Sequence, residues 1–178
     1  PLFETILDYI PAPEGDPDAG TQVLISTIDY NEYVGRIGVG KVDNGVIRVN
    51  QDVVIVNHHE PDKMKKVKVS KLYEFDGLNK VEVKEAGIGS IVAISGIADI
   101  HIGDTLCSPE NPVPIPFQKI SEPTIAMHFI VNDSPLAGQE GKYVTSRHLR
   151  DRLFRELNTD VSLRVEETET TESFKVSG

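Results

Sequence analysis

The sequence predicts a mainly β protein, in which a small antiparallel β-barrel precedes a shorter α+β unit. Short runs rich in Val and Ile follow one another from residue 21 to about residue 115, with no helical pattern between them. Prolines then interrupt this pattern, and beyond them the spacing of apolar residues becomes that of a helix flanked by strands. The chain has 178 residues, 39% of them hydrophobic, which is enough to build one or two buried cores.

Residues 1–20 are expected to hold one helix and a linker. Apolar residues between Leu2 and Ile10 recur at helical spacing after Pro1, a residue well suited to a first helical position. Residues 11–20 are rich in Pro, Gly and acidic residues, so we expect an extended, solvated linker. Because the chain opens at Pro1 and not at a methionine, we interpret the helix as the last one of a preceding domain.

Residues 21–115 are expected to form the barrel. They contain about six strand-like runs, which cover residues 23–28, 34–42, 46–49, 53–56, 65–73 and 88–95. Asp43-Asn44-Gly45 tolerates positive φ angles, so the runs on either side of it are predicted to pair as a hairpin. Closure of a small antiparallel sheet removes its unpaired edges, which favours a closed or nearly closed barrel.

Residues 116–121 are expected to link the barrel to an α+β unit at residues 122–178. In that unit Ile125–Val131 is predicted as a strand and Thr145–Leu157 as a helix, followed by two further strands at residues 161–165 and 174–176. The order β-α-β-β is the first half of a ferredoxin-like βαββαβ unit. Because half a sheet leaves edges unpaired, we expect this unit to be partly mobile or to be completed by a second copy of the chain.

The net charge is spread unevenly along the chain. It is −10 in all, of which −5 falls in residues 1–22, −2 in residues 23–121 and −3 in residues 122–178. The total argues against a nucleic-acid partner, but five lysines within a short stretch of the barrel form a local basic patch. A single cysteine, the lack of any apolar run longer than four residues and the lack of a basic residue before Arg36 argue against disulfide-rich, membrane-spanning and secreted proteins. A cytoplasmic location is therefore expected.

The stretch Gly35–Val42, GRIGVGKV, has the spacing of a phosphate-binding loop, but we interpret it as a bent barrel strand. Val42 stands where a hydroxyl would hold Mg²⁺, and a strand follows where the loop would need a helix. The five histidines lack a metal-ligand spacing, so we expect them to be solvated or in the core. Cys107 has no evident activating base and is interpreted as a small buried hydrophobe. Neither a metal site nor a catalytic residue is predicted.

Two sets of basic side chains are candidates for RNA binding. On a strand, Lys66 and Lys68 would share one face while Val67 and Val69 face the core, which presents charge in a row suited to phosphates. The candidates are Lys63, Lys65, Lys66, Lys68, Lys71, Arg147 and Arg150. Two alternatives stay open: lysines on an edge strand also discourage aggregation, and the helix arginines can form ion pairs with Asp151, four residues from Arg147 and Arg155.

Several motifs resemble those of translational GTPases. Residues 35–47, GRIGVGKVDNGVI, are similar to the G-R-x-x-x-G-x-V-x-x-G-x-I stretch of the second-domain barrel of these proteins, and Gly103–Cys107, GDTLC, is similar to the stretch that closes it. Glu122–Ile125 resembles the start of the third domain of elongation factor G-like proteins. Residues 132–147 and 163–168 resemble the BipA/TypA family of ribosome-binding GTPases.

This resemblance implies the middle fragment of a GTPase that acts on the ribosome, in translation under stress or in large-subunit assembly. It implies two partners: the ribosome and its RNA, and the GTPase domain in cis. A second copy of the fragment is a third expected partner, because of the unpaired strand edges of residues 122–178. GTP and Mg²⁺ would bind in the GTPase domain, which this chain lacks, so we expect no cofactor and no enzyme activity of the fragment itself. The alternative is a structural spacer that packs on the GTPase domain and relays nucleotide state without contacting RNA.

Overall fold

The computed structural model describes residues 1–119, 121–135, 137–139, 141–170 and 172–178, which divide into two compact units, Pro1–Phe117 and Gln118–Gly178. Residue 120 of the predicted linker and residues 136, 140 and 171 of the predicted α+β unit lie outside the described residues. In the part of the chain that is described, no helix has the length and hydropathy needed to cross a bilayer, and the longer of the two has 11 residues.

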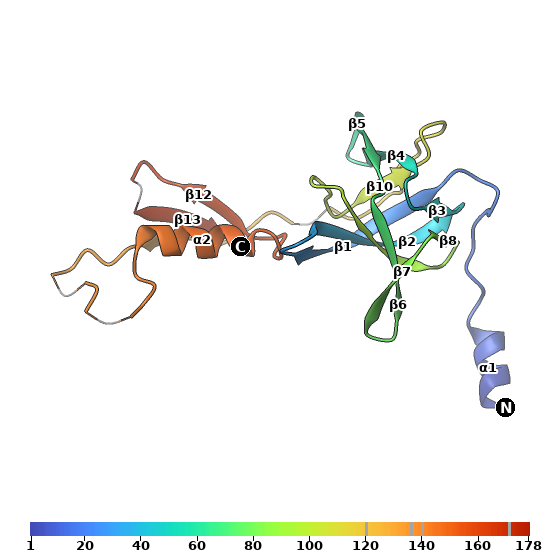
Figure 1. Ribbon diagram of the computed structural model, residues 1–178, viewed down its shortest axis with the longest axis horizontal. Coiled ribbons are helices and arrows are strands. Elements are labelled where there is room, and N and C mark those ends of the chain that lie inside the picture. The colour runs from blue at the N-terminus through green and yellow to red at the C-terminus, as the bar shows by residue number, and fades with distance from the viewer. Residues whose placement is uncertain (120, 136, 140, 171) are drawn as a thin grey trace. The chain divides into compact units, whose positions relative to one another are not determined.

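The first unit is built almost entirely of strands (Figure 1). It contains α1 (Leu2–Tyr9), β1 (Gln22–Asn31), β2 (Gly35–Asn44), β3 (Ile47–Arg48), β4 (Asp52–Asn57), β5 (Glu60–Lys68), β6 (Lys71–Asp76), β7 (Asn79–Val83), β8 (Glu85–Ala86), β9 (Ile91–Ser95) and β10 (Asp104–Cys107). Eight strands pair antiparallel in the order β5-β4-β10-β1-β2-β9-β6-β7, and β3 pairs with β8. The prediction of a mainly β, antiparallel fold is confirmed.

The strands of this unit enclose one apolar core. Ile25 of β1, Val42 of β2, Leu72 of β6, Ile94 of β9 and Leu106 of β10 are all fully buried in it. β-Branched and leucine side chains pack well on a pleated surface, and their burial is the main favourable term in folding. β5 adds only the half-buried Val67, so this strand lies at the periphery of the core.

A second, smaller cluster lies on the other face of β4 and β10. Val54, Val56 and Cys107 are buried there. The chain beyond β10 is bonded beside them: the Cys107 thiol donates to the Val113 carbonyl at 3.2 Å, and the Ile115 N–H donates to Thr105 Oγ1 at 3.0 Å. The proline-rich segment therefore continues along the barrel up to the end of the first unit.

The predicted hairpin across Asp43-Asn44-Gly45 is wrong. β2 pairs with β1 and β9, whereas β3 pairs with β8. The turn residues bind the linker instead, because Asn44 Oδ1 accepts from the Asp16 N–H at 2.9 Å and the Gly45 N–H donates to the Asp16 carbonyl at 3.0 Å. Gly45 has φ 66°, which lets the chain leave the main sheet here and cross to the small one. The linker is thus exposed, as expected, but attached to the barrel at Asp16.

Two further differences concern strand boundaries. The run predicted at residues 65–73 is two strands, β5 and β6, separated where the N–H groups of Val69 and Ser70 donate to the carbonyls of Gln51 and Ser95. β7, β8 and β10 lie outside the six predicted runs. β7 is exposed at nearly every residue, and β10 begins with two polar residues that are nevertheless buried, so neither has the alternating pattern of a half-buried strand.

The second unit has the predicted order β-α-β-β. It contains β11 (Ala126–Ile130), α2 (Ser146–Glu156), β12 (Arg164–Glu167) and β13 (Ser173–Ser177). The sheet order is β11-β13-β12, and β13 is antiparallel to both neighbours, so the two strands joined by α2 run parallel with β13 between them. Leu153 of α2 packs against Phe174 and Val176 of β13. This is the split β-α-β arrangement of a ferredoxin-like fold, as predicted.

Candidate nucleic-acid interface

Four of the five candidate lysines lie on β5, and Lys71 begins β6. β5 is an edge strand that pairs only with β4, where Lys66 stands opposite Val54 and Lys68 opposite Asp52. Every residue of β5 is exposed except the half-buried Val67. The barrel therefore presents these ammonium groups to solvent from a strand whose backbone it holds in place.

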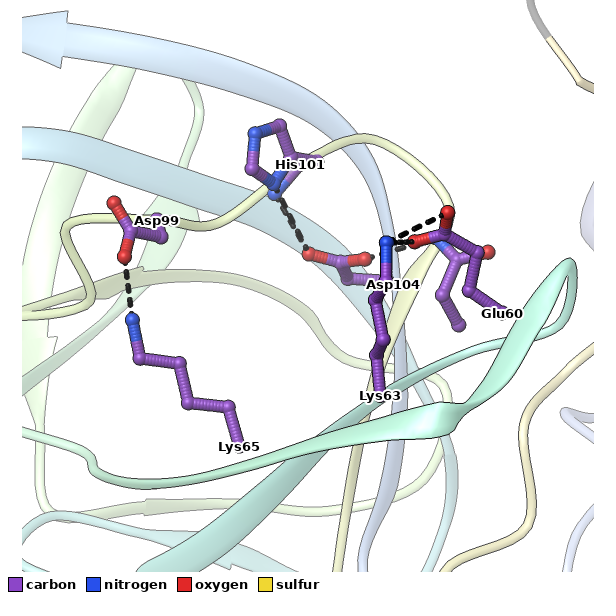
Figure 2. A network of polar contacts seen from close by, with 7 residues as sticks. Glu60, Lys63, Lys65, Asp99, His101 and Asp104 are labelled. Carbon is purple, nitrogen blue, oxygen red and sulfur yellow. Dashed lines mark hydrogen bonds and ion pairs between the residues drawn. The ribbon is translucent and has the colours of Figure 1, made fainter.

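Strand alternation divides the β5 lysines between two faces. Successive side chains of a strand point to opposite sides, so Lys65 shares a side with the core-facing Val67, and Lys66 and Lys68 share the other. Val67 packs against the core, as the sequence predicts. Figure 2 shows Lys63 and Lys65 directed toward the segment that carries Asp99 and His101. The basic row seen in the sequence is therefore two separate sets in space.

Three of the candidate lysines already have carboxylate partners. All three are exposed side chains in ion pairs with exposed acids, two of which appear in Figure 2. The pairs are Lys63–Glu60 at 2.9 Å, Lys71–Glu82 at 3.5 Å and Lys65–Asp99. The hydrogen bond from Lys65 lowers the pKa of Asp99 below its ordinary value. Exposed pairs of this kind add little to stability, so a phosphate can replace the carboxylate at low cost.

Lys66 and Lys68 differ from the other three. Within the described residues, neither has a carboxylate oxygen within 4.0 Å of its Nζ. Both line a groove of about 400 Å³, whose other lining residues are Asp52, Val53, Val67 and Pro109. The barrel thus holds two unpaired cations at the side of a partly apolar groove, and one carboxylate lies in the same groove.

The two candidate arginines lie on α2 in the second unit. Arg150 Nε is 2.6 Å from Glu167 Oε1 on β12, so this guanidinium is partly committed to holding the helix on the sheet. Arg147 is exposed and has no acidic partner among the described residues. Among the ion pairs of the described residues, neither of those considered for Asp151 is present, and Arg152 pairs with Glu156 instead.

The stretch that resembles a phosphate-binding loop is a strand, as interpreted from the sequence. Gly35–Asn44 forms β2, paired along its length with β1 and β9. A Cβ at Gly40 would lie 2.2 Å from the carbonyl oxygen of Leu24 on β1. The glycine therefore permits close approach of two strands next to a register shift between Ile25 and Thr27, and it has no phosphate-binding geometry.

Asp104 forms a buried polar centre that the sequence interpretation missed (Figure 2). Its carboxylate accepts from Asn57 Nδ2 at 2.9 Å and from the His101 N–H at 2.8 Å, and lies 3.8 Å from His101 Nδ1. The hydrogen bond to this carboxylate raises the pKa of His101 above its ordinary value. The spacing of His101 and Asp104, three residues apart in the sequence, was the signal available for this pair.

The remaining histidines and the cysteine show no chemical site. In the described ranges, no three His, Cys, Asp or Glu side chains converge as metal ligands would. His58 and His59 lie in the turn between β4 and β5, where the His59 ring packs edge-on against Phe117 with centroids 4.9 Å apart. Cys107 is buried, and burial raises the pKa of its thiol to about 11, so the prediction of a small buried hydrophobe is confirmed.

Comparison with known proteins identifies the relatives of this chain. Residues 35–107 match the family described as elongation factor Tu domain 2. The whole chain is 52% identical to a protein of Synechocystis sp. named large ribosomal subunit assembly factor BipA. Proteins of the same name from Bacillus subtilis and Escherichia coli K12 are each 45% identical, over 99% and 100% of the chain. The chain spans only 29–30% of the length of these relatives.

A solved structure supports the fold. A crystal structure of a protein from Thermus thermophilus matches 99% of this chain and 25% of that protein, with a TM-score of 0.66 and 20% sequence identity. At this identity the likeness concerns the fold alone. It agrees with a β-barrel followed by an α+β unit.

Proposed function

We propose, on the premise that this chain is homologous over its whole length to a segment of the BipA proteins, that it is the RNA-docking middle part of a large ribosomal subunit assembly factor. The parent protein is then a cytoplasmic translational GTPase that acts in ribosome assembly or in translation under stress. GTP and Mg²⁺ bind in its GTPase domain, outside this chain. The fragment itself binds neither, has no catalytic residue and does not act on a membrane.

The proposed organisation follows the boundaries inferred from the sequence. Residues 1–20 are the final helix of the GTPase domain and its linker, 21–115 the barrel, 116–121 a second linker and 122–178 part of a ferredoxin-like domain. The apolar side chains of α1 support the first of these assignments, because Phe3 is 80% and Leu7 79% exposed. Side chains of this kind are buried in most folded proteins, so α1 fits a helix that packs on the GTPase domain in cis.

One observation carries the proposal of RNA docking: an edge strand presents four lysines in an otherwise acidic chain. The local positive potential of such a strand attracts RNA even when the net charge is −10, because screening limits the reach of distant charges to about 10 Å in 0.1 M salt. Lys63, Lys65, Lys66, Lys68 and Lys71 are the proposed phosphate contacts, and Arg147 and Arg150 are secondary candidates.

The test is filter binding of a large-subunit ribosomal RNA transcript to the 178-residue chain across a range of KCl concentrations. We expect a linear fall of log K with log salt, by about 0.7–0.9 per phosphate contact. Replacing all five β5 and β6 lysines by Gln should remove most of that slope. A control with Lys41, Lys84 and Lys119 replaced by Gln, also basic residues of this chain, should keep it. Failure of the unsubstituted 178-residue chain to bind the RNA would refute the proposal.

The alternative function is a spacer that packs on the GTPase domain without contacting RNA. The ion pairs of Lys63, Lys65 and Lys71 favour it, since they show that these lysines accept protein carboxylates as partners. A pull-down with the GTPase domain of the Bacillus subtilis relative separates the two. Capture of the 178-residue chain that is lost in high salt, together with no binding of RNA, would support the spacer. Self-association is a separate question, and sedimentation velocity would report whether a second copy completes residues 122–178.

A further inference from the structure

Lys66 and Lys68 share one face of β5 and one groove. Side chains two residues apart on a strand have their Cα atoms about 6.6–6.8 Å apart and point in the same direction. Within the described residues, no carboxylate lies within 4.0 Å of either ammonium group. Both cations are therefore available to a ligand, and neither ion pair nor core packing competes for them.

The groove beside these lysines combines charge with an apolar surface. Val67 and Pro109 line it together with the two lysines, and Pro109 lies two residues after Cys107, the last residue of β10. A polynucleotide backbone offers the matching combination, because each nucleotide carries one anionic phosphate next to an uncharged sugar. An acidic protein segment matches the charge but brings no fixed alternation of charged and uncharged groups.

Among the residues that the structure describes, Asp52 is the one acidic residue that lines the groove. It stands opposite Lys68 in the β4–β5 register, yet the two do not form an ion pair within 4.0 Å. Its charge opposes an anion bound by the lysines. Removal of the Asp52 charge should therefore tighten RNA binding, a result that a purely structural role of the lysines would not predict.

We propose that the groove between β5 and Pro109 is the part of the lysine surface that binds RNA, with two consecutive backbone phosphates bound there, one by the ammonium group of Lys66 and one by that of Lys68. This proposal rests on the function proposed above and narrows it. Of the five lysines proposed above as phosphate contacts, this narrower site keeps only Lys66 and Lys68. Lys63, Lys65 and Lys71 then stay with their carboxylate partners and contribute only to the local positive potential. Asp52 limits the affinity of the site.

The experiment compares two double variants of the full 178-residue chain that remove the same charge. Lys66→Gln with Lys68→Gln should lower the salt slope for the large-subunit RNA transcript by about 1.4–1.8, since each lost contact removes 0.7–0.9. In 0.1 M salt this corresponds to about 25- to 60-fold weaker binding, if the lines meet at 1 M. Lys63→Gln with Lys71→Gln should change the slope by less than one contact. Protection of Cys107 from thiol reagents verifies that each variant is folded.

Asp52→Asn supplies a change in the opposite direction. Loss of one charge near the phosphate should tighten RNA binding by about two- to fivefold, the effect of roughly 1 kcal/mol or less between charges in water. Equal slopes for the two double variants, or unchanged binding by Asp52→Asn, would overturn the groove assignment while leaving RNA docking intact. Displacement of the RNA by poly-glutamate at equal charge would show that the occupant is an acidic protein. Absence of RNA binding by the unsubstituted 178-residue chain would overturn the proposed function together with the site.

Discussion

Gly40→Ala should destabilise the barrel severely, although it adds a single methyl group to a strand that already contains many β-branched residues. A Cβ at position 40 would lie 2.2 Å from the Leu24 oxygen, 2.9 Å from the Leu24 carbonyl carbon and 3.2 Å from Ile25 Cα. All three are backbone atoms of the paired strand β1. No side chain can rotate away, so β1 and β2 must separate at the register shift next to Ile25.

The cost follows from that geometry. Relief of the closest contact requires backbone movement of roughly 1 Å, and overpacking of a well-packed core costs typically 1–3 kcal/mol and occasionally more. Because the displaced atoms belong to the two strands that share the longest pairing in the barrel, we expect about 3 kcal/mol. That is a large fraction of the 5–15 kcal/mol by which domains of this kind are stable.

The single cysteine provides an assay that reports on the barrel alone. Cys107 is buried on β10, so a thiol reagent modifies it only when the barrel opens. Labelling as a function of urea concentration therefore gives a midpoint for the first unit, whatever the second unit does. Gly87→Ala is the matched control, because a Cβ there meets no atom within 4 Å and φ lies outside the left-handed region.

The two variants should separate clearly. Gly87→Ala should shift the free energy of unfolding by no more than about 0.5 kcal/mol. If Gly40→Ala matches Gly87→Ala within that margin, close strand approach is not the reason for a glycine at position 40. If the unsubstituted 178-residue chain binds GTP measurably and Gly40→Ala abolishes that binding, the stretch Gly35–Lys41 must be reconsidered as a phosphate-binding loop.

Three further substitutions probe the polar centre and the second core. Asp104→Ala leaves the Asn57 amide and the His101 N–H unpaired, so the urea midpoint for Cys107 labelling should fall by the equivalent of about 2–3 kcal/mol, and no fall would contradict a structural role for this carboxylate. His101 has a raised pKa in the folded chain, so the stability it adds is fully present below its unfolded pKa of about 6.5 and is lost as pH rises through the higher folded value. His101→Gln should therefore lower the urea midpoint at about pH 5.5 and leave it nearly unchanged at about pH 8.5. The decrease should be small, because the His101 side chain is 66% exposed. An equal effect at both pH values would count against the pairing with Asp104. Leu153→Ala removes a third of the buried cluster of the second unit and should cost about 2–5 kcal/mol, seen as loss of α2 ellipticity while Cys107 stays protected.

The sequence was sufficient to predict the barrel where local and tertiary signals agree. Val and Ile are frequent along β1, β2, β4 and β9, the strands whose inward residues fill much of the core, and a strand was predicted over each of them. β10 was not predicted, because its first residue, Asp104, carries a carboxylate. Asp104 can be buried only because its carboxylate oxygens accept hydrogen bonds from the Asn57 amide and the His101 N–H. The pattern of a single sequence does not show such partners.

The candidate site was predictable to the level of the strand and no further. A period of two is enough to place Lys66 and Lys68 on the face opposite Val67. It does not reveal that Lys65 pairs with Asp99, 34 residues away, because that contact depends on where the loop before β10 folds. The same limit explains the wrong hairpin, since Gly45 is a suitable turn residue whose actual neighbour is the linker at Asp16.

Edge protection and RNA binding, the two explanations for the lysines of β5, make different demands on their positions. Protection requires only that the exposed edge carry charge, so any lysine on the strand serves and the faces are equivalent. RNA binding requires free cations on one face beside a surface that a nucleotide can contact. Replacing Lys66 and Lys68 leaves Lys63 and Lys65 on the edge, so the chain should stay as soluble and as monodisperse as before while its affinity for RNA falls. If the same pair of substitutions instead causes association between chains and leaves RNA affinity unchanged, the lysines act to block strand pairing, and the groove beside them binds nothing.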